Sequence, residues 1–239
     1  MIYLDQVSKV FGKDFYAVKD MSFRIGPGEI VGFVGENGAG KTTTIKMMTG
    51  ILKPTCGHIE IKGLDMQMEP LRAKQQIGYI SDNPDLFLRL TGMEYLLLMA
   101  DLYEVDTDQR EATIEELAQS FEMTEHLYTP MNDYSHGMRQ KIMIIGTLLH
   151  KPPVWILDEP MTGLDPKASY ELKRRMKEHA KNGNAVFFST HVLSVAEQLC
   201  SRILMVKKGQ LSYDGDLESL KQKYPDKDLE EIFLLVSSN

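Results

Sequence analysis

The segment Gly35-Glu-Asn-Gly-Ala-Gly-Lys-Thr42 constrains this chain more than any other part of its sequence. It has the GxxxxGK[ST] spacing, follows the apolar run Glu29–Val34 and precedes the helix-competent run Thr42–Thr49, which Gly50 closes. Because glycines tolerate positive φ and carry no Cβ, such a backbone can wrap closely around phosphate oxygens. Successive backbone N–H groups and the N-terminus of the next helix direct their dipoles at the same anion. The segment therefore predicts a phosphate-binding loop between a buried strand and a helix.

The side chains of this loop have distinct expected roles. Lys41 would reach the β- and γ-phosphates of a nucleotide, and the Thr42 hydroxyl would bind Mg²⁺. Thr43 would donate a hydrogen bond on the α-phosphate side. ATP with Mg²⁺ is thus the expected ligand pair. The predicted nucleotide-binding residues of the loop are Gly35, Glu36, Asn37, Gly38, Ala39, Gly40, Lys41, Thr42 and Thr43.

A second motif, Val154-Trp-Ile-Leu-Asp158-Glu159-Pro160, is an apolar strand that ends in two carboxylates. Residues at the carboxyl end of a parallel strand lie where α/β sheets bind ligands. Asp158 is suited to hold Mg²⁺, directly or through water, and Glu159 to polarise an attacking water as a general base. Adjacent strand residues point in different directions, which gives the two carboxylates different roles. Together, the two motifs predict a P-loop NTPase.

The order of strand and helix signals predicts an α/β fold with an inserted helical subdomain. Period-two alternation over the first 30 residues indicates an N-terminal antiparallel β subdomain. Helix-like segments then follow at Met93–Tyr103, Gln109–Phe121 and Ser135–His150. From 154 to 213, strand and helix signals alternate, which predicts a mostly parallel sheet covered on both faces. We expect one domain of residues 1–225, with the helical subdomain at about 84–150, and a tail of residues 226–239; the chain from 216 onward is expected to be helical.

Composition excludes several classes of protein. With 239 residues and 43% apolar content, the chain can bury a large core and is not globally disordered. Its net charge of −7 argues against a nucleic-acid partner. No stretch approaches 18 uninterrupted apolar residues and the N-terminus lacks a basic start, so a cytoplasmic location is expected. Cys56 and Cys200 form no CxxC pair and are predicted to be small buried hydrophobes.

Three further segments resemble motifs of the ATP-binding cassette (ABC) ATPases. Tyr134-Ser-His-Gly-Met-Arg-Gln-Lys141 resembles the signature motif, usually written LSGGQ. Met161–Pro166 resembles the D-loop that follows the second carboxylate, and Ser189-Thr-His191 resembles the segment with the switch histidine. With the two motifs above, five motifs occur in the family's order, and the agreement in order and spacing extends from the N-terminal strands to about residue 215. The resemblance implies the ABC ATPase fold and ATP hydrolysis.

This resemblance implies a subunit that dimerises head to tail. ATP would lie between the phosphate loop of one copy and Ser135 and Gly137 of the other, so a homodimer would hold two complete sites. His191 would contact the γ-phosphate and help to position water. Phe11 stands where the family places an aromatic ring on adenine; Tyr16 is a competing candidate, and core packing is the alternative for both.

Two motifs depart from the family pattern. Asp82 stands where the family generally has Gln, sometimes Glu, in the loop that leads to the helical subdomain. Its carboxylate could still serve Mg²⁺ and the attacking water, but its shorter reach suggests contact with the metal through water and a slower site. The signature motif retains Ser135 and Gly137. Its substituted positions are Tyr134, His136 and Met138. This variant resembles the ATPases of bacterial ABC-2-type exporters more than those of importers.

The leading hypothesis is the ATP-hydrolysing subunit of an exporter that drives a separate integral membrane permease. Such a subunit would associate peripherally with the inner face of the cell membrane. The apolar, methionine-containing stretch from Leu86 to Met99, with the Asp82 loop, would form a groove for a permease helix, although these residues could instead be subdomain core. A soluble ABC-type ATPase without a transport role is the alternative. A binding-only regulator is disfavoured by the retained Lys41 and Glu159.

Overall fold

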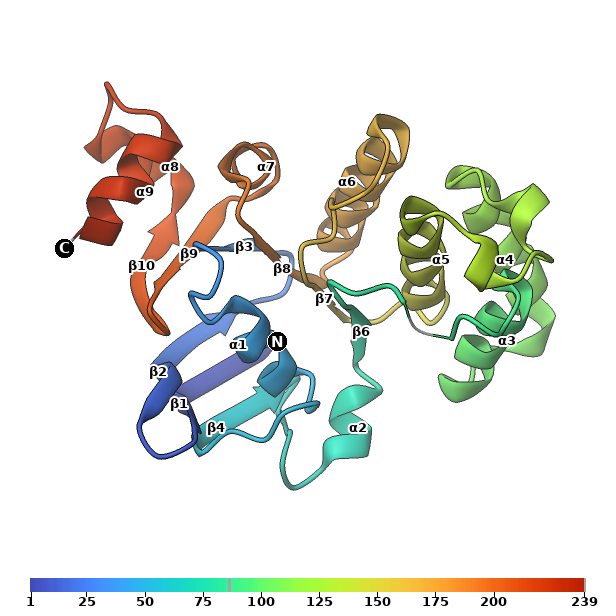
Figure 1. Cartoon of the computed structure of the whole chain (residues 1–239), viewed down its shortest axis with the longest axis horizontal. Coiled ribbons are helices and arrows are strands. Elements are labelled where there is room, and N and C mark those ends of the chain that lie inside the picture. Colours follow the sequence, from blue (N-terminus) through green and yellow to red (C-terminus); the bar gives the residue numbers. More distant parts are fainter. Residues whose placement is uncertain (86, 239) are drawn as a thin grey trace.

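The computed structural model describes residues 1–85 and 87–238, in which two sheets form the framework (Figure 1). The N-terminal sheet is antiparallel and has the strand order β2-β1-β4-β5. Period-two alternation places one face of each long strand inside, as the sequence predicted. Its strands are β1 (Ile2–Phe11), β2 (Phe15–Ile25), β4 (Cys56–Ile61) and β5 (Leu64–Asp65).

The second sheet has six strands in the order β10-β9-β3-β8-β7-β6. All neighbouring pairs are parallel except β9 with β10. Every residue of β3, β7 and β8 is buried, which explains why these strands are apolar apart from Ser189 and Thr190 at the end of β8. The strands are β3 (Ile30–Val34), β6 (Ile77–Ile80), β7 (Val154–Leu157), β8 (Ala185–Thr190), β9 (Arg202–Lys207) and β10 (Gln210–Asp216).

The helices divide into two groups. One group gathers at one end of the molecule, between β6 and β7 in the sequence (Figure 1). It contains α3 (Gly92–Leu102), α4 (Thr107–Ser120), the 3₁₀ turns η1 (Thr124–His126) and η2 (Met131–Asp133), and α5 (His136–Leu148). The others lie along the sheets: α1 (Lys41–Met48), α2 (Pro70–Lys74), α6 (Pro166–Lys181), α7 (Leu193–Leu199), α8 (Leu217–Lys223) and α9 (Leu229–Ser238).

Side-chain caps fix where the helices of the site begin. Ser135 caps α5 by accepting a hydrogen bond from the Met138 N–H at 3.3 Å. Asp165 caps α6 by accepting from the Ala168 N–H at 2.8 Å, and Pro166 occupies the first helical position. The Ser135 cap thus starts α5 within the segment that resembles the signature motif, and the Asp165 cap starts α6 at the end of the segment that resembles the D-loop.

Two hydrophobic cores lie on opposite faces of the six-stranded sheet. Alternation along β8 sends Phe187 into the smaller core, between the two sheets, and Phe188 into the larger core. The larger core joins the helical group to α6, α7 and α9, and it buries Trp155 completely. Leu229 and Ile232 of α9 are also buried there, so the C-terminal helix packs on the rest of the molecule.

The observed elements match the predicted strands and helices within a few residues, and the chain after Asp216 is helical as expected. Sequence reasoning missed α2, β5 and β6, which are too short to show a periodic pattern. The prediction that both cysteines are buried is wrong for Cys56, because it begins β4 on the face opposite the buried Ile59; Cys200 is buried as predicted.

Leu86 and Asn239 lie outside the described residues. Among the residues that are described, no helix is both long and apolar enough to cross a membrane. The division into a domain of residues 1–225 and a tail of residues 226–239 stays a prediction.

Candidate active site

The glycine-rich loop connects β3 to α1 and is held closely against its neighbours. A Cβ on Gly35 would lie 2.6 Å from the carbonyl oxygen of Val206. Gly40 has φ of 106°, and a Cβ there would lie 2.7 Å from the carbonyl oxygen of Ala17. No side chain fits at either position: Gly35 is required by the close approach of the Val206 backbone, and Gly40 by its positive φ and by the approach of Ala17.

Lys41 begins α1 and points back over the loop. Its side chain is buried, and Nζ donates hydrogen bonds to the carbonyl oxygens of Gly35 at 2.7 Å and Glu36 at 3.2 Å. The same Nζ lies 3.6 Å from Oε1 of Glu159. The ammonium group therefore sits where the loop and the predicted general base meet.

Asp158, at the end of β7, is fully buried beside the loop. Its Oδ1 accepts a hydrogen bond from the Ser189 hydroxyl, whereas Oδ2 has no hydrogen-bond partner among the described residues. Burial raises the pKa of Asp158, and the nearby hydroxyl groups of Ser189 and Thr42 oppose that shift. A buried, unsatisfied carboxylate oxygen next to a threonine hydroxyl fits a hard divalent cation such as Mg²⁺, which prefers oxygen ligands.

Glu159 adopts a left-handed backbone conformation, with φ of 47°. This conformation is costly for a residue with a side chain and is held here by a hydrogen bond from the Glu159 N–H to the Ser189 hydroxyl at 3.0 Å. The turn directs the carboxylate toward Lys41, while Oε2 lies 3.0 Å from Nδ1 of His191. Glu159 therefore contacts both Lys41 and His191, and the three residues were predicted from three separate segments.

Asp82 follows β6 at the same edge of the sheet. It is exposed and accepts a hydrogen bond from the Ser81 hydroxyl at 3.1 Å. Its charge contributes to the raised pKa of Asp158, after the burial of that carboxyl. The position is thus close enough to act electrostatically on the predicted metal ligand.

Ser135 and Gly137 are not brought to this cluster within one chain. They lie at the start of α5 in the helical group, whereas α1 lies below the six-stranded sheet (Figure 1). The start of α5 instead packs against the segment that follows Glu159. A Cβ on Gly137 would lie 2.6 Å from the carbonyl oxygen of Gly163, and the His136 ring packs against Gly163. Lys141 also pairs with Asp165 at 2.7 Å and lowers the pKa of that carboxyl.

Aromatic side chains are exposed on the β1–β2 hairpin. Phe11 is 43% exposed and Tyr16 is 51% exposed, so neither ring is part of a core. Phe15 of the same hairpin is also exposed, and sequence reasoning did not single it out. Lysine ammonium groups lie over two of the rings: Lys9 Nζ is 5.4 Å from the Phe11 centroid, and Lys19 Nζ is 5.7 Å from the Tyr16 centroid.

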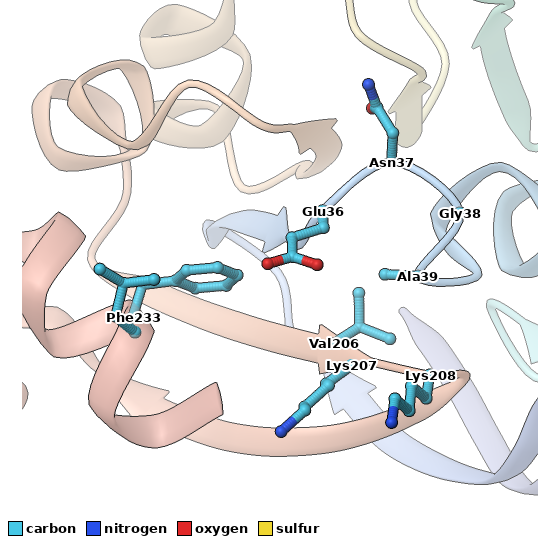
Figure 2. A pocket seen from close by; sticks show the side chains of 9 residues that line it. Glu36, Asn37, Gly38, Ala39, Val206, Lys207, Lys208 and Phe233 are labelled. Atoms are coloured by element: carbon cyan, nitrogen blue, oxygen red, sulfur yellow. The ribbon is translucent and has the colours of Figure 1, made fainter. Parts of the chain in front are cut away.

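Two further features were not predicted from the sequence. Ser189 bridges the two carboxylate residues; its place before Thr190 and His191 on a strand beside β7 was the available signal. A pocket of about 220 Å³ also lies between the loop and the C-terminal helix, as Figure 2 shows. Glu36–Ala39, Val206–Lys208 and Phe233 line it, so α9 reaches the back of the phosphate loop.

The fold and this loop define a P-loop α/β cassette, and comparisons with known proteins agree. The ABC transporter family model matches residues 18–162. The chain is 35% identical to the ABC transporter ATP-binding protein NatA of Bacillus subtilis, over 98% of this chain and 97% of that protein. It is 34% identical to the bacitracin transport ATP-binding protein BcrA of Bacillus licheniformis, over 93% of this chain and 72% of that protein.

Among solved structures, the ATP-binding cassette MJ0796, a dimer in a post-hydrolysis state with ADP and Pi, superposes with a TM-score of 0.83. The sequences are 25% identical, and the match covers 91% of this chain and 99% of that one. This chain belongs to the ABC transporter family as an ATP-binding subunit. The predicted fold class and family are confirmed.

Proposed function

We propose that this chain is the ATP-hydrolysing subunit of an ABC exporter, with Mg²⁺ as its cofactor. The observation that carries the proposal is the meeting of Lys41, Glu159 and His191 beside the buried Asp158. The family relation and the neighbouring MJ0796 structure with ADP and Pi support nucleotide hydrolysis.

The residues of the cluster divide the work of hydrolysis. The backbone N–H groups of residues 38–43 and the Lys41 ammonium bind the phosphates. To do so, Lys41 gives up its hydrogen bonds to the carbonyl oxygens of the loop and donates to phosphate oxygens instead. Glu159 accepts a proton from the attacking water, and His191 orients the Glu159 carboxylate and contacts the γ-phosphate. Asp158, Thr42 and, through water, Asp82 would hold Mg²⁺, which supplies electrostatic stabilisation of the phosphates.

The site becomes complete in a head-to-tail homodimer. Among the described residues, no hydrogen bond or ion pair joins Ser135 or Gly137 to the phosphate loop of the same chain, and both would reach the γ-phosphate bound by the partner copy. The N-terminus of α5 adds a favourable dipole toward that anion. Because ATP binds both copies, its hydrolysis would release them. Phe11, or Tyr16 in its place, stacks on adenine from the β1–β2 hairpin.

The transport role rests on relatives. BcrA is named for bacitracin transport, and a Rhizobium leguminosarum relative, 33% identical over 90% of this chain, is named for Nod factor export. By analogy, the chain binds a permease at the inner face of the cell membrane. The docking region is the Asp82 loop with the exposed part of the stretch 87–99, where Phe87 is 46% exposed; Tyr95 and Leu96 of that stretch are buried in the larger core.

The test compares the wild-type protein with Glu159→Gln, which removes the general base but keeps the shape of the side chain. We expect phosphate release to fall by about 10²–10⁴-fold and ATP to convert the variant from monomer to dimer on size exclusion. Glu218→Gln, an exposed substitution on α8, is the control and should behave as wild type. A wild-type protein without Mg²⁺-dependent hydrolysis, or a Glu159→Gln protein that stays monomeric with ATP, would contradict the proposal.

A further inference from the structure

Ser189 carries a buried hydroxyl whose two partners are the acidic residues at the end of β7. It lies near the end of β8, between β3 and β7, and has no exposed surface. Its Oγ accepts a hydrogen bond from the Glu159 N–H at 3.0 Å and donates its single proton to Oδ1 of Asp158. Because an N–H can only donate, the directions of both bonds are fixed. The hydroxyl therefore joins the two acidic residues into one chain of hydrogen bonds.

The bond to Asp158 decides which of its two carboxylate oxygens is available. Oδ1 is occupied by the Ser189 hydroxyl, whereas Oδ2 has no hydrogen-bond partner among the residues that the structure describes. The torsion that turns a carboxylate about its Cβ–Cγ bond is broad, so only such a partner fixes its plane. Ser189 thus holds the carboxylate in the orientation that leaves Oδ2 as the oxygen for a cation.

The bond to Glu159 supports a backbone conformation that is costly for a residue with a side chain. Glu159 lies two residues beyond the end of β7 and has φ of 47°. In this conformation its Oε1 lies 3.6 Å from Nζ of Lys41, and its Oε2 lies 3.0 Å from Nδ1 of His191. Without the hydroxyl, we expect the backbone to relax toward negative φ, which would carry the carboxylate away from both groups.

We propose that Ser189 is a positioning residue for ATP hydrolysis, a role that rests on the function proposed above. One hydroxyl sets the orientation of the metal-binding carboxylate and that of the general base together. Within the part of the chain that the structure describes, this hydroxyl has no hydrogen bond to the glycine-rich loop or to Lys41, which bind the phosphates. Its loss should therefore slow turnover and weaken the response to Mg²⁺, with little effect on ATP binding at saturating Mg²⁺.

Steady-state kinetics of Ser189→Ala beside the wild-type protein test this role. We expect kcat to fall by about tenfold and the KM for ATP at saturating Mg²⁺ to change by less than about twofold. Ser189→Thr keeps a hydroxyl on the same carbon and should recover most of the kcat. The matched control is Thr147→Val, because the Thr147 hydroxyl is also buried but accepts from Trp155 Nε1 at 3.2 Å, in the contact between α5 and β7. This control should keep the wild-type kcat.

Two further readouts do not depend on hydrolysis. When the binding of a fluorescent ATP analogue is titrated with Mg²⁺, the midpoint for Ser189→Ala should lie at about three- to tenfold higher Mg²⁺ than for the wild-type protein. Thr147→Val should keep the wild-type midpoint. In hydrogen exchange of the wild-type protein followed by NMR, the Glu159 amide should be protected, because its N–H is bonded to a buried hydroxyl.

Several results would overturn the inference. They are an unprotected Glu159 amide, a Ser189→Ala protein with the wild-type kcat and Mg²⁺ midpoint, equal losses in Thr147→Val, and a folded Ser189→Thr protein as slow as Ser189→Ala. If circular dichroism shows that Ser189→Thr does not fold, Ser189→Ala and the amide exchange decide the question. A wild-type protein without hydrolysis refutes the proposed function instead, and the Mg²⁺ midpoint and the amide exchange then still report whether Ser189 orients the two carboxylates.

Discussion

Acidification should weaken the fold through His150, which follows α5. Its ring stacks on that of Tyr103, with centroids 3.7 Å apart and planes 11° apart, and Nε2 lies 3.3 Å from the carbonyl oxygen of Ile77. Nδ1 has no hydrogen-bond partner among the residues that the structure describes. Burial lowers the pKa of His150 to about 4, against the opposing hydrogen bond to Ile77.

The direction of the effect follows from linkage. Because the pKa of His150 in the folded state lies below its ordinary value of 6.5, the unfolded chain takes up the proton first as the pH falls. The contribution of neutral His150 to the free energy of unfolding is therefore fully present above about pH 6.5 and is lost as the pH falls toward 4. At about 1.4 kcal/mol per pKa unit, the loss is about 2 kcal/mol at pH 5 and about 3 kcal/mol when complete.

Urea unfolding near pH 7.5 and pH 5, followed by circular dichroism, measures this loss. His150→Gln does not titrate and can still donate to the Ile77 carbonyl, so it is the matched variant. We expect the wild-type protein to lose about 2 kcal/mol more than the variant between the two pH values. Other groups titrate in both proteins and cancel in the comparison. Equal losses would show that burial of His150 does not exclude its charged form.

Three further predictions concern single residues. Gly137→Ala should lower the free energy of unfolding by about 1–3 kcal/mol in thermal denaturation, because its Cβ would meet Gly163; an unchanged Tm would refute the contact. Burial raises the pKa of the Cys200 thiol to about 12, so iodoacetamide near pH 8 should label Cys56 alone; mass spectrometry that finds two labels on the native chain would contradict this. Asp82→Gln should hydrolyse ATP about two- to tenfold faster, and equal rates with equal Mg²⁺ dependence would sink the idea that Asp82 slows the site.

The parts of the site that are local in sequence were predictable. A glycine-rich loop and a strand that ends in carboxylates each specify their own backbone, so Lys41 and Asp158 could be placed before any tertiary contact was known. The alternation of strands and helices also fixed a largely parallel sheet. The chemical roles of these residues stay predictions until activity is measured.

The contacts that depend on strand order were not predictable. Glu159 contacts both Lys41 and His191 because β8 lies between β3 and β7, an order that no short window of sequence contains. Ser189 can bond to both Asp158 and Glu159 for the same reason, because β8 lies next to β7 in the sheet. The approach of α9 to the phosphate loop is likewise tertiary, because helical propensity says nothing about which surface a helix covers.

Charge is unevenly distributed along the chain: residues 84–135 carry a net charge of −10 and the remaining residues +3, and the helical group lies at one end of the molecule (Figure 1). Near a bare anionic bilayer, the surface potential would exert a torque that turns this end toward bulk water. Above the cationic loops of a membrane partner, the torque would reverse and present α3 and α4 first. The protein would then be oriented before it touches its partner, at separations up to the Debye length of roughly 10 Å at 0.1 M salt.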